Sequence, residues 1–277
     1  MISIDNISMA YGSPPRTVLD RIDLEIEEGE FVCVLGQTGC GKSTLLRLIL
    51  GSEQPTSGRV LIDGKEHKQP DRMRGYVPQK YSLFPDRTVL DNITFGPELC
   101  EFRLLSRFTP AYYRRRNELR EEAMGYLRRI GLRATDAKKY PDQLSGGMQQ
   151  RVAIAQALMT SPRILLMDEA FSALDPATRR GMQALIRDLW QSIGKTILFV
   201  THNTHEAVHL ATRVIVLAKD NPEHGSRIAL DLKVPETVHE DDIAHLVRKL
   251  EAASQESDSV ASPNEEGSPQ SAAVRVG

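Results

Sequence analysis

A glycine-rich stretch at residues 36–44 has the residue types that hold a chain of phosphate groups. It reads GQTGCGKST, and its glycines allow the backbone to turn so that successive N–H groups point at phosphate oxygens. The lysine would bridge the β- and γ-phosphates of a nucleotide, and the serine after it would bind Mg²⁺. A glycine-rich turn without a ligand is the alternative, which the strand and helix expected on either side disfavour. The candidate phosphate-binding residues are Gly36, Gln37, Thr38, Gly39, Cys40, Gly41, Lys42, Ser43 and Thr44.

An acidic pair follows a short apolar run further along the chain, in the sequence RILLMDE at residues 163–169. The apolar residues predict a buried strand that ends at Asp168, whose carboxylate is suited to hold Mg²⁺ directly or through water. Glu169 is then a candidate to orient and polarise an attacking water molecule. Taken alone, such a pair would more often be two solvated loop residues, and it is the phosphate loop that favours a catalytic role.

A second pair of glycines opens an apolar run with helical spacing at residues 144–158, LSGGMQQRVAIAQAL. Ser145 is a favourable helix N-cap, and Gly146 and Gly147 allow a ligand to approach the backbone closely. The unpaired N–H groups and the dipole of a helix make its N-terminus an anion site. The sequence therefore predicts two anion-binding sites, one more than a phosphate loop alone requires.

The elements that would position these residues alternate along the chain. Residues 2–32 alternate apolar and polar side chains, which predicts antiparallel strands. Further strands are expected at residues 30–36, 58–64, 74–79, 163–169, 195–202 and 213–218, and helices at residues 42–51, 118–130, 176–194 and 204–211. Strands that alternate with helices predict an α/β fold, with a mainly parallel sheet covered on both faces.

Composition limits the classes of protein to which the chain can belong. Its 277 residues are 40% hydrophobic and 26% charged, which is typical of a globular protein. The net charge of −2 gives no support to a nucleic-acid partner. The longest apolar runs have the length of strands, and the N-terminus lacks the pattern of a signal peptide. Three cysteines without paired spacing, Cys33, Cys40 and Cys100, indicate free thiols in a reducing, cytoplasmic compartment.

The stretch LSGGMQQR at residues 144–151 resembles the signature of one family, the ATP-binding subunits of ATP-binding-cassette (ABC) transporters. Met148 stands where the commonest form of that signature has glutamine. In this family the signature binds the γ-phosphate of ATP that is held by the phosphate loop of another subunit. The resemblance therefore implies that Ser145, Gly146 and Gly147 act in a head-to-tail dimer with two composite sites.

The resemblance also implies the organisation of the chain into a P-loop NTPase fold. A RecA-like core with a mainly parallel sheet is joined by an N-terminal antiparallel β subdomain and an inserted helical subdomain. From about residue 254 the chain is rich in Ser, Pro, Glu, Asn and Gly, which predicts a disordered tail. The expected divisions are an ATP-binding domain at 1–253, with core at about 1–94 and 160–235, helical subdomain at about 95–159 and C-terminal helix at about 240–253, then the tail at 254–277.

Other positions match the remaining motifs of the family in the expected order. Tyr11 resembles the aromatic residue that stacks on adenine, although a strand tyrosine can also simply pack locally. Gln79 resembles the glutamine that contacts Mg²⁺ and the attacking water, and Asp175 resembles the D-loop residue at the dimer seam. His202, followed by Asn203 in place of the usual acidic residue, resembles the histidine that hydrogen-bonds the γ-phosphate; taken alone, such a histidine is more often structural. The resemblance implies catalytic roles for Glu169, His202 and Gln79 and a magnesium site at Ser43, Gln79 and Asp168.

Within the family the chain is most similar to the ATPases of nitrate, sulfonate and taurine importers, with DEAF in place of their usual DEPF. This implies hydrolysis of ATP with Mg²⁺ at the cytoplasmic face of the membrane, coupled to uptake of a small solute. The implied partners are a second ATP-binding subunit, polytopic permease subunits and, indirectly, a solute-binding protein, with no nucleic acid. The alternative is a soluble ABC-type ATPase that acts on ribosomes or DNA. A regulatory module without turnover would require a damaged Glu169 or His202, and both are present.

Residues 96–120 are longer than the matching stretch of typical relatives and belong to the expected helical subdomain. The stretch could touch lipid headgroups or an acidic partner loop, and we hypothesise that it tunes docking to one membrane partner. A solvated helical face with aromatic packing beneath it is an equally good interpretation. Its basic residues are Arg103, Arg107, Arg114, Arg115, Arg116 and Arg120, and its aromatic residues are Phe102, Phe108, Tyr112 and Tyr113.

Overall fold

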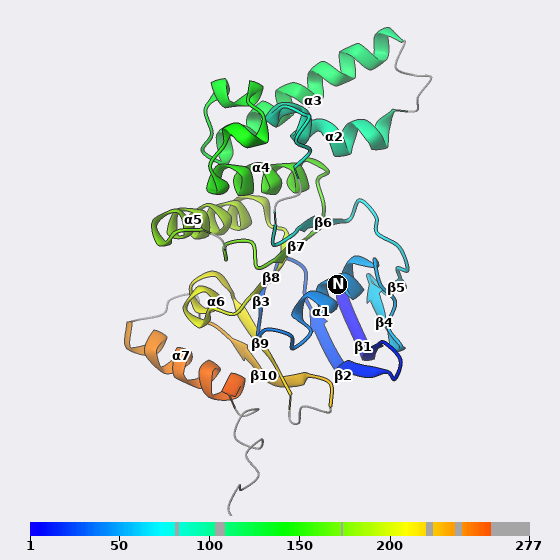
Figure 1. Ribbon diagram of the computed structural model, residues 1–277, viewed down its shortest axis with the longest axis vertical. Helices are drawn as coiled ribbons and strands as arrows, with labels where there is room; N and C mark the ends of the chain where they lie inside the picture. The colour runs from blue at the N-terminus through cyan, green and yellow to red at the C-terminus, as the bar shows by residue number, and fades with distance from the viewer. Residues whose placement is uncertain (81–82, 103–108, 173, 220–223, 236–239, 256–277) are drawn as a thin grey trace, which may run out of the picture.

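The computed structural model contains two β-sheets with helices packed against them and a separate group of helices at one end (Figure 1). It describes residues 1–80, 83–102, 109–172, 174–219, 224–235 and 240–255. Within these residues, no helix combines the length with the apolar composition needed to cross a lipid bilayer. The order of strands and helices is that of an α/β protein, as the sequence predicts.

The smaller sheet is antiparallel and contains the two N-terminal strands. Its order is β2-β1-β4-β5, formed by β1 (Ile2–Tyr11), β2 (Arg16–Ile26), β4 (Ser57–Ile62) and β5 (Lys65–Glu66). Every second side chain in the last part of β2 is buried, so that one face packs and the other meets water. This confirms the antiparallel strands that the period-two pattern predicts.

The larger sheet has the order β10-β9-β3-β8-β7-β6. Its neighbours from β9 to β6 are parallel, and β10 is antiparallel to β9. The sequence analysis does not predict β10, an edge strand whose side chains are half-buried or exposed and whose apolar signal is therefore weak. The strands are β3 (Phe31–Leu35), β6 (Arg74–Val77), β7 (Ile164–Asp168), β8 (Thr196–Thr201), β9 (Arg213–Ala218) and β10 (Arg227–Lys233).

Both faces of the parallel strands are buried, which explains their near-continuous apolar sequences. Helix α1 (Lys42–Leu50) and the smaller sheet share a core with one face. Helices α5 (Pro176–Ile193), α6 (Thr204–Leu210) and α7 (Glu240–Gln255) pack on the other. Since β3, β7 and β8 are parallel, the loops after their C-terminal ends meet at one edge of the sheet, where ligands of such folds bind.

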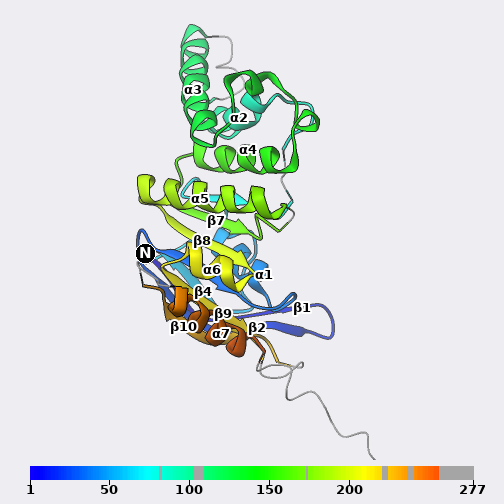
Figure 2. The same ribbon diagram turned by 90° about the vertical axis from the view of Figure 1, so that its left-hand side faces the viewer.

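The remaining large helices form a group with its own core, beyond α5 in both views (Figures 1 and 2). They are α2 (Val89–Glu101), α3 (Pro110–Arg129) and α4 (Gly146–Met159). The helix predicted at residues 118–130 begins earlier, at Pro110. Proline suits the first helical turn, and the Thr109 side chain caps the helix by accepting a hydrogen bond from the Tyr112 N–H.

Three of the arginines in the 96–120 stretch are already paired with carboxylates of α2 and α3. Arg115 lies 2.8 Å from Glu101 and also contacts two other glutamates of α3. Arg116 pairs with Glu98 at 3.3 Å, and Arg120 pairs with Asp91. The stretch is therefore much less basic than its arginine count indicates. The predicted members Arg103, Arg107 and Phe108 lie outside the described residues.

The C-terminal helix extends slightly further than the sequence predicts. Helix α7 ends at Gln255, so Ser254, which the composition assigns to the tail, is helical. Val247 and Leu250 of this helix are buried against the larger sheet, as the amphipathic spacing predicts. Residues 256–277, expected to form a disordered tail, lie outside the described residues.

Candidate functional site

The glycine-rich loop connects β3 to α1, as its sequence predicts. Gly39 and Gly41 have φ angles of +82° and +95°, a region that side chains disfavour. At Gly36 an added Cβ atom would lie 2.5 Å from the Leu217 carbonyl oxygen, so the loop can pass β9 only with glycine there. Of the other predicted phosphate-binding positions, Gln37, Thr38 and Gly39 are exposed, whereas Cys40, Gly41 and Thr44 are buried, and burial raises the pKa of the Cys40 thiol.

Lys42 begins α1, and its ammonium group turns back into the loop. Its Nζ atom donates hydrogen bonds of 2.8 Å to the carbonyl oxygens of Gly36 and Gln37. It also lies 3.8 Å from Glu169 Oε1, and the side chain is only 4% exposed. A positive charge is thus held inside a ring of backbone atoms, where phosphate oxygens would be its strongest partners.

Ser43 and Asp168 place two oxygen atoms together beside the loop. The Ser43 hydroxyl donates a 2.9 Å hydrogen bond to Asp168 Oδ1 at the end of β7. Tyr76 of β6 donates to the other carboxylate oxygen at 3.3 Å; burial and the Asp168 charge raise the pKa of Tyr76 to about 12. Hydroxyl and carboxylate oxygens fit Mg²⁺, which usually takes few protein ligands and completes its shell with phosphates and water. The described residues gather no larger cluster of metal-ligating side chains.

Glu169 is the residue at which the predicted catalytic side chains converge. Gln79 Nε2 donates to its Oε2 atom at 3.0 Å, His202 Nδ1 lies 3.6 Å from Oε1, and Lys42 approaches Oε1 from the loop. The Glu169 backbone has a φ of +44°, an uncommon conformation for a residue with a side chain and one found at functional sites. Of the three predicted magnesium ligands, Ser43 and Asp168 contact each other, whereas Gln79 contacts Glu169.

His202 and Asn203 follow β8 at the same edge of the sheet. The imidazole of His202 is 57% exposed and so remains open to a ligand. Asn203 caps α6 by accepting a hydrogen bond from the Glu206 N–H at 3.0 Å. Asparagine caps helices about as well as aspartate, so this cap does not require an acidic residue.

The loop after Glu169 is held by contacts that the sequence analysis missed. Asp175 caps α5 by accepting hydrogen bonds of 3.1 Å from the N–H groups of Ala177 and Thr178. The Arg179 guanidinium donates to the Phe171 carbonyl at 3.3 Å and to two further carbonyls of the loop. No sequence signal distinguishes Arg179 from a solvated helical arginine, because its partners are backbone oxygens.

The signature residues begin α4, far from the phosphate loop of the same chain in both views (Figures 1 and 2). The exposed Ser145 side chain caps the helix by accepting from the Met148 N–H at 3.4 Å, as predicted. Gly147 has a second reason to be glycine, because an added Cβ atom would lie 2.5 Å from Thr178 Cγ2 on α5. The two predicted anion sites do not face each other within one chain.

Tyr11 is the last residue of β1. Its side chain is 38% exposed, and its hydroxyl donates to Glu53, just after α1. Burial and this hydrogen bond raise the pKa of Tyr11, whereas a hydrogen bond with the Thr44 side chain lowers it. The Tyr11 hydroxyl is therefore held near Thr44, the last of the predicted phosphate-binding residues.

Comparison with known proteins places this site in a family. The model of the family described as ABC transporter matches residues 19–172. An uncharacterized ABC transporter ATP-binding protein of Methanocaldococcus jannaschii is 48% identical, over 84% of each chain. A nitrate import ATP-binding protein of Synechocystis sp. is 46% identical over 72% of this chain and 70% of the relative. A taurine import ATP-binding protein of Rhizobium johnstonii is 41% identical over 83% of this chain and 84% of the relative.

A solved structure agrees with these relatives. A dimeric ATP-binding cassette in a post-hydrolysis state, bound to ADP and Pi, has a TM-score of 0.71 at 32% identity. The match covers 86% of this chain and 100% of the other. Together with the phosphate loop, the Asp168–Glu169 pair and the capped signature helix, these matches show that the chain belongs to the ABC transporter family, as one of its ATP-binding subunits.

Proposed function

We propose that two copies of this chain, or one copy and a sibling, bind ATP and Mg²⁺ between the phosphate loop of one subunit and the signature of the other. Closure of this head-to-tail dimer would permit hydrolysis and drive a pair of permease subunits. The observation that carries the proposal is the convergence of Lys42, Gln79 and His202 on Glu169, beside the Ser43–Asp168 pair. Such a set can position a water molecule against a phosphoryl group.

In the proposed reaction, each side chain acts by position and charge. Lys42 exchanges its loop carbonyls for the β- and γ-phosphate oxygens, and Ser43 and Asp168 hold Mg²⁺, which when bound neutralises charge on those phosphates. Glu169 accepts a hydrogen bond from the attacking water, which Gln79 helps to orient. His202, whose imidazole is exposed beside Glu169, donates to the γ-phosphate as its charge develops.

The separation of the two anion sites within one chain supports a dimer. Ser145 is exposed at the start of α4, and this helix lies with α2 and α3 rather than near α1 (Figures 1 and 2). A second chain, reversed in direction, can bring its own signature to the phosphate loop. A dimeric arrangement of the similar cassette bound to ADP and Pi supports the same assembly.

We further propose import of a small oxyanion-type solute at the cytoplasmic face of the membrane. The relatives named for nitrate and taurine import support this solute class. The implied partners are polytopic permease subunits and, through them, a solute-binding protein. Purification of the chain from membranes tests this choice: a co-purifying polytopic subunit is expected, whereas ribosomes or DNA would instead support the soluble alternative.

The substitution Glu169→Gln tests the catalytic assignment. The amide has nearly the same shape but cannot accept a proton, so ATP binding is retained while hydrolysis falls at least about 100-fold. ATP binding and phosphate release are measured on the same preparation, and size-exclusion chromatography with ATP then detects the trapped dimer. Glu66→Gln, on the exposed strand β5, is the matched control and keeps normal turnover. Near-normal hydrolysis in Glu169→Gln would remove Glu169 from its proposed role.

A further inference from the structure

A short chain of polar contacts holds the aromatic ring of Tyr11 from its edge. The Tyr11 hydroxyl donates to Glu53 Oε2, and Arg47 of α1 donates to Glu53 Oε1 at 3.1 Å. The Glu53 side chain is 24% exposed and Arg47 is 46% exposed, so the chain lies at the surface of the molecule. Because Glu53 contacts only the hydroxyl, this contact leaves the two faces of the ring available for stacking.

The end of α1 brings Glu53 back to Arg47. Gly51 ends the helix with a φ of +81°, which reverses the direction of the chain. The N–H groups of Gly51, Ser52 and Glu53 all donate to the Arg47 carbonyl oxygen, at 3.0, 3.1 and 3.4 Å. The carboxylate of Glu53 is therefore set beside the helix by the backbone, before any contact with Tyr11.

The end of β1 is tied to the same segment. The Thr56 N–H donates to the Ser8 carbonyl at 2.8 Å, and the Thr56 hydroxyl accepts from the Ala10 N–H at 3.1 Å. These bonds join the strand that ends at Tyr11 to the turn that carries Glu53. The spacing between the two side chains is thus determined by the backbone on both sides.

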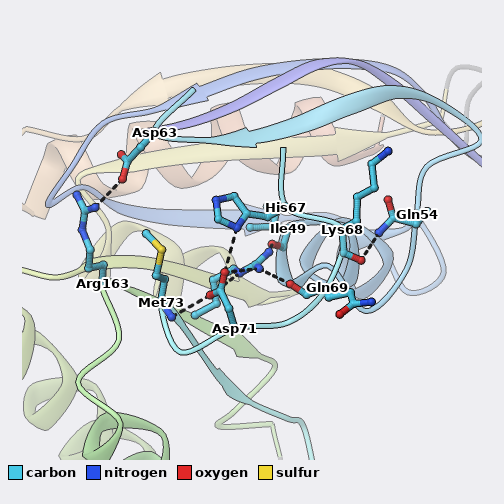
Figure 3. A network of polar contacts seen from close by, with 10 residues as sticks. Ile49, Gln54, Asp63, His67, Lys68, Gln69, Asp71, Met73 and Arg163 are labelled. Carbon is cyan, nitrogen blue, oxygen red and sulfur yellow. Dashed lines mark hydrogen bonds and ion pairs between the residues drawn. The ribbon is translucent and has the colours of Figure 1, made fainter. Parts of the chain in front are cut away.

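A buried arginine, Arg74, contacts the end of α1. Arg74 donates to the Ile49 carbonyl near the end of α1 at 2.8 Å and pairs with Asp71 at 2.9 Å. Gln54, the residue after Glu53, donates to the Lys68 carbonyl at 2.7 Å. Figure 3 shows Gln54 beside Lys68 and Ile49 beside the polar contacts around Asp71. Glu53 therefore projects from a well-anchored part of the backbone.

We propose that Glu53 is a positioning residue for the base of the nucleotide, orienting the Tyr11 ring on which adenine stacks. This proposal rests on the proposed binding of ATP and on the adenine-stacking role that the family resemblance implies for Tyr11. The Thr44 side chain reaches the same hydroxyl, so the edge of the ring lies beside the last residue of the phosphate loop. Arg47 offsets the negative charge of Glu53, which would otherwise repel a polyphosphate.

The competing explanation is that the contact between Tyr11 and Glu53 only ties β1 to α1 and has no role in binding. The affinities for two ligands distinguish these explanations. ADP contains adenine, whereas inorganic pyrophosphate contacts the phosphate loop alone. A positioning role for Glu53 affects only ADP, but a disturbed α1 would weaken both. The dissociation constants of both ligands, with Mg²⁺ present, are measured by titration calorimetry alongside the melting temperature.

Tyr11→Ala removes the ring and gives the largest change with which the other variants are compared. It raises the Kd of ADP about tenfold, since stacking on an aromatic ring contributes measurably to base binding. Tyr11→Phe and Glu53→Ala each raise it about threefold, the size of one hydrogen bond, and leave pyrophosphate unchanged. The double variant is no worse than either single variant, because both remove the same contact. Glu53→Gln, which keeps an acceptor oxygen, restores most of the affinity, and Glu66→Ala is the neutral control.

Different results would refute the positioning role of Glu53 and the stacking role of Tyr11. If Tyr11→Ala weakens ADP but Glu53→Ala does not, or if Tyr11→Phe and Glu53→Ala are additive, Glu53 does not position the ring. An equal loss of ADP and pyrophosphate affinity in Glu53→Ala would likewise overturn the proposal and show a structural role. If Tyr11→Ala leaves ADP affinity unchanged, the stacking role of Tyr11 itself is wrong.

Discussion

Replacement of Gly147 by alanine tests how the signature helix packs on α5. Gly147 is buried, and an added Cβ atom would lie 2.5 Å from Thr178 Cγ2, closer than packed atoms can approach. Either Thr178 rotates or the two helices separate. Rotation is opposed because the side chain of Thr178 hydrogen-bonds Asp175, the N-cap of α5. The strain therefore falls on the contact between α4 and α5.

The expected size of this effect follows from two opposing contributions. Overpacking of a close contact costs about 1–3 kcal/mol. Alanine is favoured over glycine in a helix by up to about 1 kcal/mol, which offsets part of this cost. The net loss in the free energy of unfolding is about 1–2 kcal/mol, which for a chain of this size lowers Tm by about 2–4 °C.

The assay compares Gly147→Ala with the double variant that also carries Thr178→Ser. Serine lacks Cγ2 but keeps the hydroxyl that bonds Asp175, so the double variant regains most of the lost Tm in thermal circular dichroism. If Gly147→Ala does not lower Tm, or the double variant is as unstable as Gly147→Ala, the packing argument fails.

Two further predictions concern charges in the helical group. Burial raises the pKa of Asp91, but hydrogen bonds from Thr88 and Arg120 outweigh this and leave the pKa below 3.8. Because the carboxylate is favoured in the folded state, its contribution to stability is present above pH 3.8 and is lost as pH falls through the lowered pKa. Asp91→Asn should therefore flatten the decrease in Tm on acidification, and an unchanged acid profile would contradict this. Arg115→Ala removes three surface ion pairs and should lower the free energy of unfolding by no more than about 1 kcal/mol, measured in urea against Arg114→Ala; a larger loss would mean that the pairs are not screened by solvent.

Much of the local structure could be predicted from short stretches of sequence. The phosphate loop, the end of α1 at Gly51 and the cap of α4 by Ser145 all depend on a few adjacent residues. Helix caps and glycine turns are local, because the hydrogen bonds that define them join residues a few positions apart. The start of α3 was missed although its signals, Thr109 and Pro110, are equally local.

Contacts between distant segments could not be read from the sequence. The charge of the 96–120 stretch is one case, since its arginines meet carboxylates on α2 that no spacing rule links to them. The contact of Tyr76 with Asp168 is another, because it depends on β6 lying beside β7 in the sheet. Strand β10 is recognised only when its pairing with β9 is known.

The sequence by itself determined the residue types of the site and the order of the motifs that contain them, because each motif is complete within about ten residues. Only the tertiary structure decided that Gln79, His202 and Lys42 all approach Glu169. Three of these residues follow β6, β7 and β8, and Lys42 follows the loop after β3. They meet because parallel strands end at the same edge of one sheet, and the order of strands within that sheet is set by the packing of the whole chain.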